Sequence, residues 1–215
     1  MSSRRLGIIG AGKFGTSIAR AAVAAGYDVV LAGSRPPEAI ELMIEILVPG
    51  ARAVSVEAAV AHADLLVLAV PTTRFREIAS DRFAGKILVD TMNYWQLTDG
   101  VIADFVDAPA RTSEGVQRHF PSARVVKSLN QLGYHQFNDE QRRRGTPGRI
   151  AMAAAGDDRE AVRAVLALID DLGFDPVDAE PLAAGASLGP GGPAFGVAAT
   201  RDQLVGLLGR ETASA

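Results

Sequence analysis

The chain has 215 residues, 48% of them hydrophobic, with a net charge of -3 and no cysteine. This length suffices for one well-buried α/β domain with a small appendage. The absence of cysteine excludes disulfides and thiolate chemistry, and no basic run is interleaved with aromatic residues, so we expect no nucleic-acid partner. Residues 1–5 contain no hydrophobic leader, and no stretch approaches the ~20 apolar residues that span a bilayer. We therefore expect a cytoplasmic protein without a membrane partner.

The amino-terminal segment predicts a strand, a glycine-rich turn and a helix. Apolar residues 6–9 precede the spacing G-x-G-x-x-G, and small apolar residues follow at helical intervals to residue 25. In this motif the glycines allow a tight turn, a close approach of the backbone to a pyrophosphate, and close packing of helix on strand. The glycines predicted to hold the pyrophosphate are Gly10, Gly12 and Gly15, and Lys13 and Phe14 between them are also predicted to bind the cofactor. The segment indicates dinucleotide binding, with a purely structural glycine turn as the alternative.

The end of the second expected strand, residues 28–32, favours one dinucleotide over the other. NAD-binding proteins carry an acidic residue there for the adenine ribose, but this chain has Gly33, Ser34 and Arg35. Arg35 offers a planar, permanently charged fork for phosphate oxygens, and Ser34 adds a hydroxyl donor. We predict that the cofactor is NADP, with Ser34 and Arg35 holding its 2′-phosphate. An ordinary turn with a solvated arginine is the alternative.

The remaining chain alternates between strand and helix patterns. The further expected strands are 53–54, 65–70, 86–89, 123–128, 149–155 and 174–177, and the expected helices are 38–47, 56–62, 72–79, 113–120, 157–172 and 200–208. Such alternation predicts a Rossmann-type α/β fold with a doubly wound, mostly parallel sheet. From about residue 137 to residue 148 the chain turns polar, and no helix or strand is assigned there. We expect one NADP-binding domain with an integral substrate site over residues 1–180. A glycine- and proline-rich extension over residues 181–215 would form a lid or a dimer arm.

In an open parallel sheet, ligands bind at the carboxyl ends of the strands, near the switch in strand order. The candidates there are Val70 and Pro71 beside the cofactor, Thr91, Met92 and Asn93 at the nicotinamide, and Lys127 and Asn130 at the carboxamide, the ribose or the second substrate. For Lys127 the alternative is a structural ion pair with Asp90.

Candidate proton-transfer groups are few. His62 and His119 fall on expected amphipathic helices and are predicted to be surface residues, whereas His135 follows the sixth strand and could enter the site. No cluster of His, Asp and Glu has the spacing of a metal site, so we expect no metal. A dehydrogenase acting on an alcohol needs a group that moves the hydroxyl proton, for which Lys127 and His135 are weak catalytic candidates. Hydride exchange between two redox cofactors needs mainly two rings held in register.

The order of these motifs resembles a known family. G-x-G-x-x-G, then G-S-R at 33–35, Val-Pro at 70–71 and V-V-K-S-L-N at 125–130 look like the NADP-dependent oxidoreductases of the coenzyme F-420 (deazaflavin) type. The resemblance covers most of residues 4–180 and extends to the flavin-reducing modules of membrane ferric reductases. It implies a Rossmann fold, hydride transfer between NADPH and coenzyme F-420 or a flavin such as FMN or FAD, and a homodimer.

Two alternatives to this function remain open. One is an NADPH-dependent dehydrogenase or imine reductase for a small organic substrate, with Lys127 or His135 as proton donor. The other is a non-catalytic, NADP-sensing regulatory domain. The run Arg142–Arg144 could contact the anionic tail of a deazaflavin coenzyme or could simply be solvated.

Overall fold

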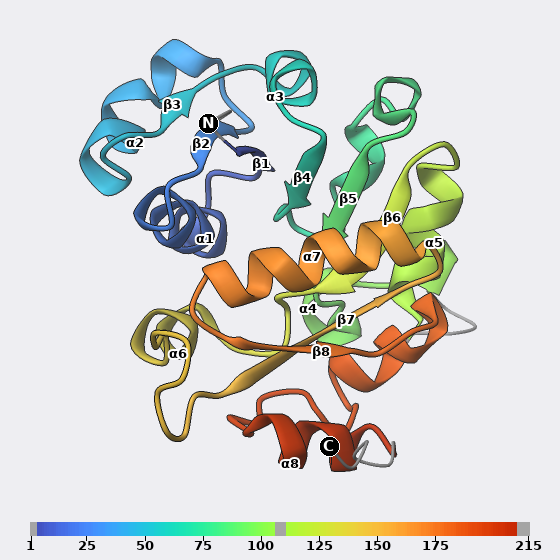
Figure 1. The fold of residues 1–215 in the computed structure, drawn as a ribbon. Helices are drawn as coiled ribbons and strands as arrows, with labels where there is room; N and C mark the ends of the chain where they lie inside the picture. Colours follow the sequence, from blue (N-terminus) through green and yellow to red (C-terminus); the bar gives the residue numbers. More distant parts are fainter. Residues whose placement is uncertain (1–3, 106–110, 210–215) are drawn as a thin grey trace.

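An eight-stranded sheet in the order β3-β2-β1-β4-β5-β6-β7-β8 forms the centre of the protein (Figure 1). The computed structural model describes residues 4–105 and 111–209. Its strands are β1 Arg5–Ile9, β2 Asp28–Ala32, β3 Arg52–Ala53, β4 Leu65–Leu68, β5 Ile87–Asp90, β6 Arg124–Ser128, β7 Ala151–Gly156 and β8 Asp175–Asp178. Neighbouring strands are parallel except β6 and β7, which are antiparallel. The predicted Rossmann-type, mostly parallel sheet is thus confirmed.

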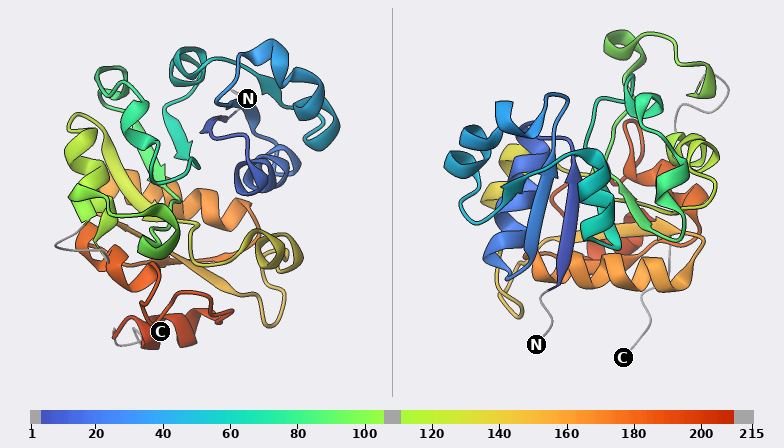
Figure 2. Two further views of the ribbon diagram at one scale, coloured as in Figure 1. Left: turned by 180° about the vertical axis from the view of Figure 1, so that it is seen from behind. Right: turned by 90° about the horizontal axis from the view of Figure 1, so that it is seen from above.

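Helices cover both faces of the sheet (Figure 2). The α-helices of the described residues are α1 Lys13–Ala24, α2 Glu41–Leu47, α3 Val56–His62, α4 Gln96–Asp99, α5 Thr112–His119, α6 Tyr134–Asp139, α7 Arg159–Asp171 and α8 Arg201–Leu207. The 3-10 turns are η1 Pro37–Ala39, η2 Phe75–Glu77, η3 Asp81–Phe83, η4 Ala103–Phe105 and η5 Leu182–Leu188. Over residues 4–105 and 111–209, no helix combines the length and the apolar character needed to cross a membrane.

The strand sequences are apolar on both sides because both faces of the sheet are covered. In β1, Leu6 and Ile8 pack in the cluster that includes the apolar sides of α1 and α7, whereas Ile9 packs in the cluster on the opposite face. Helix α7 begins at the N-cap Asp158, whose carboxylate accepts a hydrogen bond from the backbone N–H of Ala161 at 2.8 Å. Sequence periodicity therefore predicted these elements well.

The described part of the carboxyl-terminal segment packs on β7. Alanine side chains of β7 form a third apolar cluster with residues from η5, the loop after it and α8, including Leu188 and Leu204. Gly185 in η5 is required there, because a Cβ atom at this position would lie 2.9 Å from the Cβ of Lys127. The role of residues 181–215 as a lid or dimer arm remains a prediction.

Two local predictions were wrong. Residues 72–79 do not form a helix: the Thr72 hydroxyl donates to Asp99 Oδ2 at 3.0 Å, with no capping bond, and only the short turn η2 forms. Conversely, the last residues of helix α6, which ends at Asp139, lie within the polar segment 137–148. Phe137, which is fully buried, anchors this helix through ring contacts with Phe14 and Phe174 at centroid distances of 5.5 and 5.1 Å.

The two histidines predicted at the surface are partly buried instead. The imidazole of His62 lies 3.1 Å from the carbonyl oxygen of Asp28, and that of His119 lies 3.0 Å from the carbonyl oxygen of Ile78. Both rings therefore tie a helix end to a neighbouring backbone segment, which periodicity alone could not reveal.

Candidate nucleotide-binding site

The turn between β1 and α1 requires glycine at two positions. Gly10 has φ +123°, and a Cβ atom there would lie 2.1 Å from the carbonyl oxygen of Ala69 at the end of β4. A Cβ atom at Gly15 would lie 1.8 Å from the carbonyl oxygen of Gly10. Any side chain at either position would therefore force the turn, the helix or the neighbouring strand to move.

Gly12 differs, because a Cβ atom there would meet no protein atom within 4 Å. It is the N-cap of α1, its backbone is extended, and no side chain caps the helix. The first N–H groups of a helix lack intrahelical partners, and the helix dipole favours an anion beside them. The space in front of Gly12 is therefore open toward these N–H groups, and binding of a pyrophosphate there remains a prediction.

Lys13 stands beside this cradle with its side chain directed to α6. Its ammonium lies 3.4 Å from the hydroxyl of Tyr134 and 5.2 Å from the centroid of that ring. Tyr134 in turn lies against His135, with the two ring centroids 4.0 Å apart. His135 is exposed, so its imidazole is accessible next to the residue that contacts Lys13. Its role as a proton donor remains a prediction.

A cavity of about 490 Å³ opens at the carboxyl ends of β1, β2 and β4, the predicted switch region. Six predicted residues line it, namely Gly10, Gly12, Ser34, Arg35, Val70 and Pro71. Arg35 is exposed and forms no hydrogen bond or ion pair with the described part of the chain. The structure therefore brings the glycine turn and the G-S-R segment together around one space.

One wall of this cavity was not predicted from the sequence. Arg74, Glu77 and Ile78 line it from the turn η2 and the residues on either side of that turn. These residues closely follow Pro71, so their position in the sequence placed them near the site. The helix that we expected over residues 72–79 did not indicate which of them would line the cavity.

Lys127 and Asp90 form the buried ion pair that the sequence left open as an alternative. The Lys127 ammonium lies 3.5 Å from Asp90 Oδ2 and also contacts the carbonyl oxygen of Met92, and both charged side chains are at least 98% buried. Asp90 also accepts bonds from the Ser113 hydroxyl at 2.7 Å and the Met92 N–H at 2.9 Å. Burial lowers the pKa of Lys127, although the carboxylate of Asp90 opposes this shift. The contacts support a structural role, and contact of Lys127 with substrate remains a prediction.

Asn93 and Asn130 lock each other in place. The Asn93 amide donates to the backbone oxygen of Asn130 and accepts from its side-chain amide, both at 3.0 Å. Asn130 Nδ2 also donates to the carbonyl oxygen of Leu188 at 2.7 Å, while its buried Oδ1 has no partner. Leu129, just before it, has φ +60°, a left-handed conformation that is strained for leucine. Such strain tends to occur at functional sites, which supports the prediction that this segment serves the substrate side.

Thr91 and Met92 are more enclosed than their neighbour Asn93. The Thr91 hydroxyl donates to the carbonyl oxygen of Leu68 at 3.0 Å, and Met92 packs with the aromatic cluster under the sheet. Asn93 is only partly buried. Contact of these residues with a nicotinamide remains a prediction, and Asn93 is the most accessible of the three.

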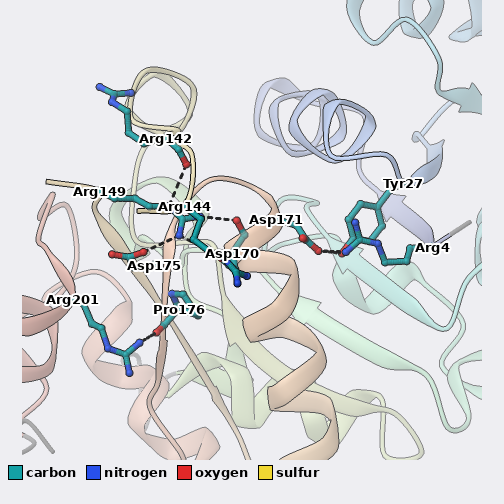
Figure 3. Close-up of polar contacts among 10 residues, drawn as sticks. All are labelled: Arg4, Tyr27, Arg142, Arg144, Arg149, Asp170, Asp171, Asp175, Pro176 and Arg201. Atoms are coloured by element: carbon teal, nitrogen blue, oxygen red, sulfur yellow. Dashed lines mark hydrogen bonds and ion pairs between the residues drawn. The ribbon is translucent and has the colours of Figure 1, made fainter. Parts of the chain in front are cut away.

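The arginine run at 142–144 lies away from the cradle. It lines a separate cavity of about 440 Å³ with Ala24 and Ala25 at the carboxyl end of α1, about 18 Å along the helix from Gly12. Arg144 pairs there with Asp170 (Figure 3). This placement gives no support to a contact between the run and a coenzyme at the cradle. Within residues 4–105 and 111–209, no group of three or more His, Cys, Asp or Glu side chains is placed to hold a metal ion.

The fold and the glycine cradle define a dinucleotide-binding protein of the doubly wound class. Residues 5–94 match the family described as "NADP oxidoreductase coenzyme F420-dependent". The matched residues contain the glycine turn and the G-S-R segment, so the similarity to NADP oxidoreductases lies in the nucleotide-binding part of the chain.

Individual proteins are similar to this chain over more of its length. The chain is 29% identical over 181 residues to the metalloreductase STEAP3 of Rattus norvegicus, an alignment that covers 83% of the chain and 34% of the relative. The chain therefore spans about a third of that relative's length. Among solved structures, a hypothetical protein from Sinorhizobium meliloti is 30% identical with a TM-score of 0.81, covering 94% of this chain and 97% of that one. A protein from Arthrobacter sp. FB24, provisionally named an F420-dependent NADP-reductase, is 26% identical with a TM-score of 0.71, covering 86% and 88%.

Proposed function

We propose that the protein binds NADPH in the cavity at the carboxyl ends of β1, β2 and β4 and passes hydride between it and coenzyme F-420 or a flavin. The observation that carries the nucleotide half is the single cavity lined by Gly10, Gly12, Ser34 and Arg35. No acidic residue stands at position 33, where one would repel a 2′-phosphate.

Each element of the cradle has a distinct role in this proposal. Gly12 leaves room for the pyrophosphate, and the first N–H groups of α1 bind it. Ser34 and Arg35 bind the 2′-phosphate with charge-assisted hydrogen bonds. Asn93, held at both ends of its amide by Asn130, positions the nicotinamide carboxamide. When bound, NADPH supplies the hydride, and the protein contributes orientation.

The assignment of the acceptor is supported by the names of related proteins. Coenzyme F-420 appears in the family description and in the name of the Arthrobacter protein, and STEAP3 is named a metalloreductase. Lys127 forms an ion pair with Asp90 and contacts the carbonyl oxygen of Met92, so its role in this proposal is to hold the loop at residues 91–93 in place. We further propose that the protein acts in the cytoplasm as a homodimer, with FMN or FAD as the other possible ring acceptors.

Titration with NADPH and NADH tests the nucleotide half. Loss of the charged contact to a phosphate in Arg35→Ala should weaken NADPH binding by about tenfold or more and leave NADH binding unchanged. Arg163→Ala, which removes an exposed arginine on α7, is the matched control and should bind both nucleotides as the wild type does. Equal affinity of the wild type for the two nucleotides would refute the assignment of the 2′-phosphate site.

Absorbance assays with NADPH and either coenzyme F-420 or FMN test the acceptor. Turnover with a ring acceptor supports the proposal. Turnover only with a ketone or imine, lost in His135→Ala, would favour the dehydrogenase or imine reductase instead. Tight NADPH binding with no turnover of any acceptor would favour the sensing domain.

A further inference from the structure

The part of the cavity lining that follows β4 in the chain carries an ion pair between Arg74 and Glu77. Arg74 Nε lies 3.1 and 3.0 Å from the two carboxylate oxygens of Glu77, and its Nη2 lies 2.6 Å from Oε2. Between them in the chain, Phe75 is fully buried and stacks on Phe105 with centroids 5.9 Å apart. The buried ring anchors the turn η2, so that the ion pair is presented from a fixed backbone.

The position of this pair indicates which part of the nucleotide it meets. The inference rests on the proposed function, in which Ser34 and Arg35 hold the 2′-phosphate on the β2 side of the cavity. The adenine base then extends toward the β4 side, where Val56, Val70 and Ile78 offer apolar surface. Arg74 and Glu77 line the same cavity and also follow β4 in the chain, so an edge of a base bound there would lie beside this pair.

The pair presents an acceptor to that edge. An ionised carboxylate only accepts hydrogen bonds and has about four lone-pair positions on its two oxygens. Arg74 occupies one position on Oε1 and two on Oε2, which leaves Oε1 able to accept another donor. The guanidinium also neutralises the carboxylate, which lessens its repulsion of the nucleotide phosphates. At position 6 adenine carries a donor, the amino group, whereas hypoxanthine carries an oxo acceptor there and has its N1–H donor at the adjacent ring position.

We propose that Glu77, positioned by Arg74, accepts a hydrogen bond from the 6-amino group of adenine and selects adenine dinucleotides over their 6-oxo analogues. Arg74 acts through Glu77 as a positioning residue and does not contact the 2′-phosphate. The 6-oxo group of a hypoxanthine base would face the carboxylate oxygen with no proton between them, which costs affinity.

The test compares binding of NADPH with that of its deamino analogue, reduced nicotinamide hypoxanthine dinucleotide phosphate, by calorimetry. The wild type should prefer NADPH by about tenfold, the value of one hydrogen bond to a charged group. Glu77→Gln should reduce this preference to near one, because its amide can donate to the 6-oxo group. Both side chains of the pair are at least half exposed, so the variant should fold.

Two further variants separate this role from others. Arg74→Ala should reduce the preference for NADPH over the deamino analogue and leave the preference for NADPH over NADH unchanged. Arg76→Ala, on the same turn but outside the cavity lining, is the control and should change neither ratio.

The failures are distinguishable. If the wild type binds NADPH but binds the deamino analogue equally well, the role of Glu77 is refuted while the proposed function stands. If Arg74→Ala abolishes the preference for NADPH over NADH, Arg74 binds the 2′-phosphate, and the positioning role is refuted. If the wild type binds no NADPH, the proposed function fails and this inference fails with it.

Discussion

The contrast between Gly12 and Gly15 offers a sharp test of where the pyrophosphate binds. A methyl group at Gly12 would meet no protein atom within 4 Å, and the backbone there, with φ -81° and ψ -175°, is open to alanine. Alanine is a poorer N-cap than glycine but also restricts the unfolded chain, and these effects of about 0.5–1 kcal/mol oppose each other. Gly12→Ala should therefore keep the free energy of unfolding of the wild type within about 1 kcal/mol.

The same methyl group should be costly to the ligand. It would occupy the space in front of the α1 N-terminus and displace the pyrophosphate from the first N–H groups. Losing two charge-assisted hydrogen bonds of about 1.5 kcal/mol each corresponds to about a 100-fold weaker affinity for NADPH. Calorimetric titration measures this loss, and urea unfolding measures the stability.

Gly15→Ala is the comparison that separates binding from folding. Its Cβ atom would lie 1.8 Å from the carbonyl oxygen of Gly10, so the helix must move away from the turn. We expect this variant to lose about 2 kcal/mol or more of stability, as overpacking does. If Gly12→Ala binds NADPH as tightly as the wild type while remaining folded, the pyrophosphate does not lie at the α1 N-terminus and the assignment of the cradle is wrong.

Two buried charge clusters give further predictions. Lys127→Met leaves Asp90 buried without its cation and should destabilise the protein by about 3 kcal/mol in urea unfolding. The double variant Lys127→Met with Asp90→Asn should restore much of this loss. If the losses of the two single variants simply add, the two side chains are not coupled. Burial lowers the pKa of Lys127 in the folded protein, so between this lowered pKa and the ordinary value of 10.5 the unfolded chain binds a proton that the folded protein does not. The free energy of unfolding should therefore rise with pH across this range. Lys127→Met removes the titrating group and should flatten the rise. The guanidinium of Arg149 is buried and lies 2.8 Å from both Asp170 and Asp175 (Figure 3). Arg149→Met should lower the free energy of unfolding by about 3 kcal/mol in the same assay. An unchanged unfolding midpoint would show that water solvates the two carboxylates without the arginine.

Much of the fold was predictable because its strands are short, apolar and bounded by clear signals. The spacing of the glycine motif located β1 and α1, and Gly26 marked the end of that helix. Prediction failed where tertiary contacts override local pattern. Thr72 could have capped a helix but instead bonds Asp99, a residue 27 positions away. Helix α6 forms in a polar segment because Phe137 packs between two distant aromatic rings.

The grouping of the glycine turn, the G-S-R segment and Val70-Pro71 around one cavity was predictable for a related reason. Its residues lie on turns directly after strands, and the sheet order alone brings those turns together. The wall with Arg74 and Glu77 escaped prediction because it depends on the conformation of η2, which Phe75 fixes through burial. The strained backbone at Leu129 also had no local signal, since leucine is not a residue typical of left-handed conformations.

The buried pair fixes the backbone of the loop that is predicted to serve the substrate. Asp90 is the last residue of β5 and pairs in register with Lys127 of β6. Their side chains form an ion pair next to the loop that carries Asn93. The Lys127 ammonium contacts the Met92 carbonyl and Asp90 accepts from the Met92 N–H, so both backbone groups of that residue are fixed. Asn93 follows at once and is clamped by Asn130. Under the proposed function, the contribution of this lysine is to order the loop at residues 91–93, because the rate of hydride transfer between two rings depends on how well the rings are aligned.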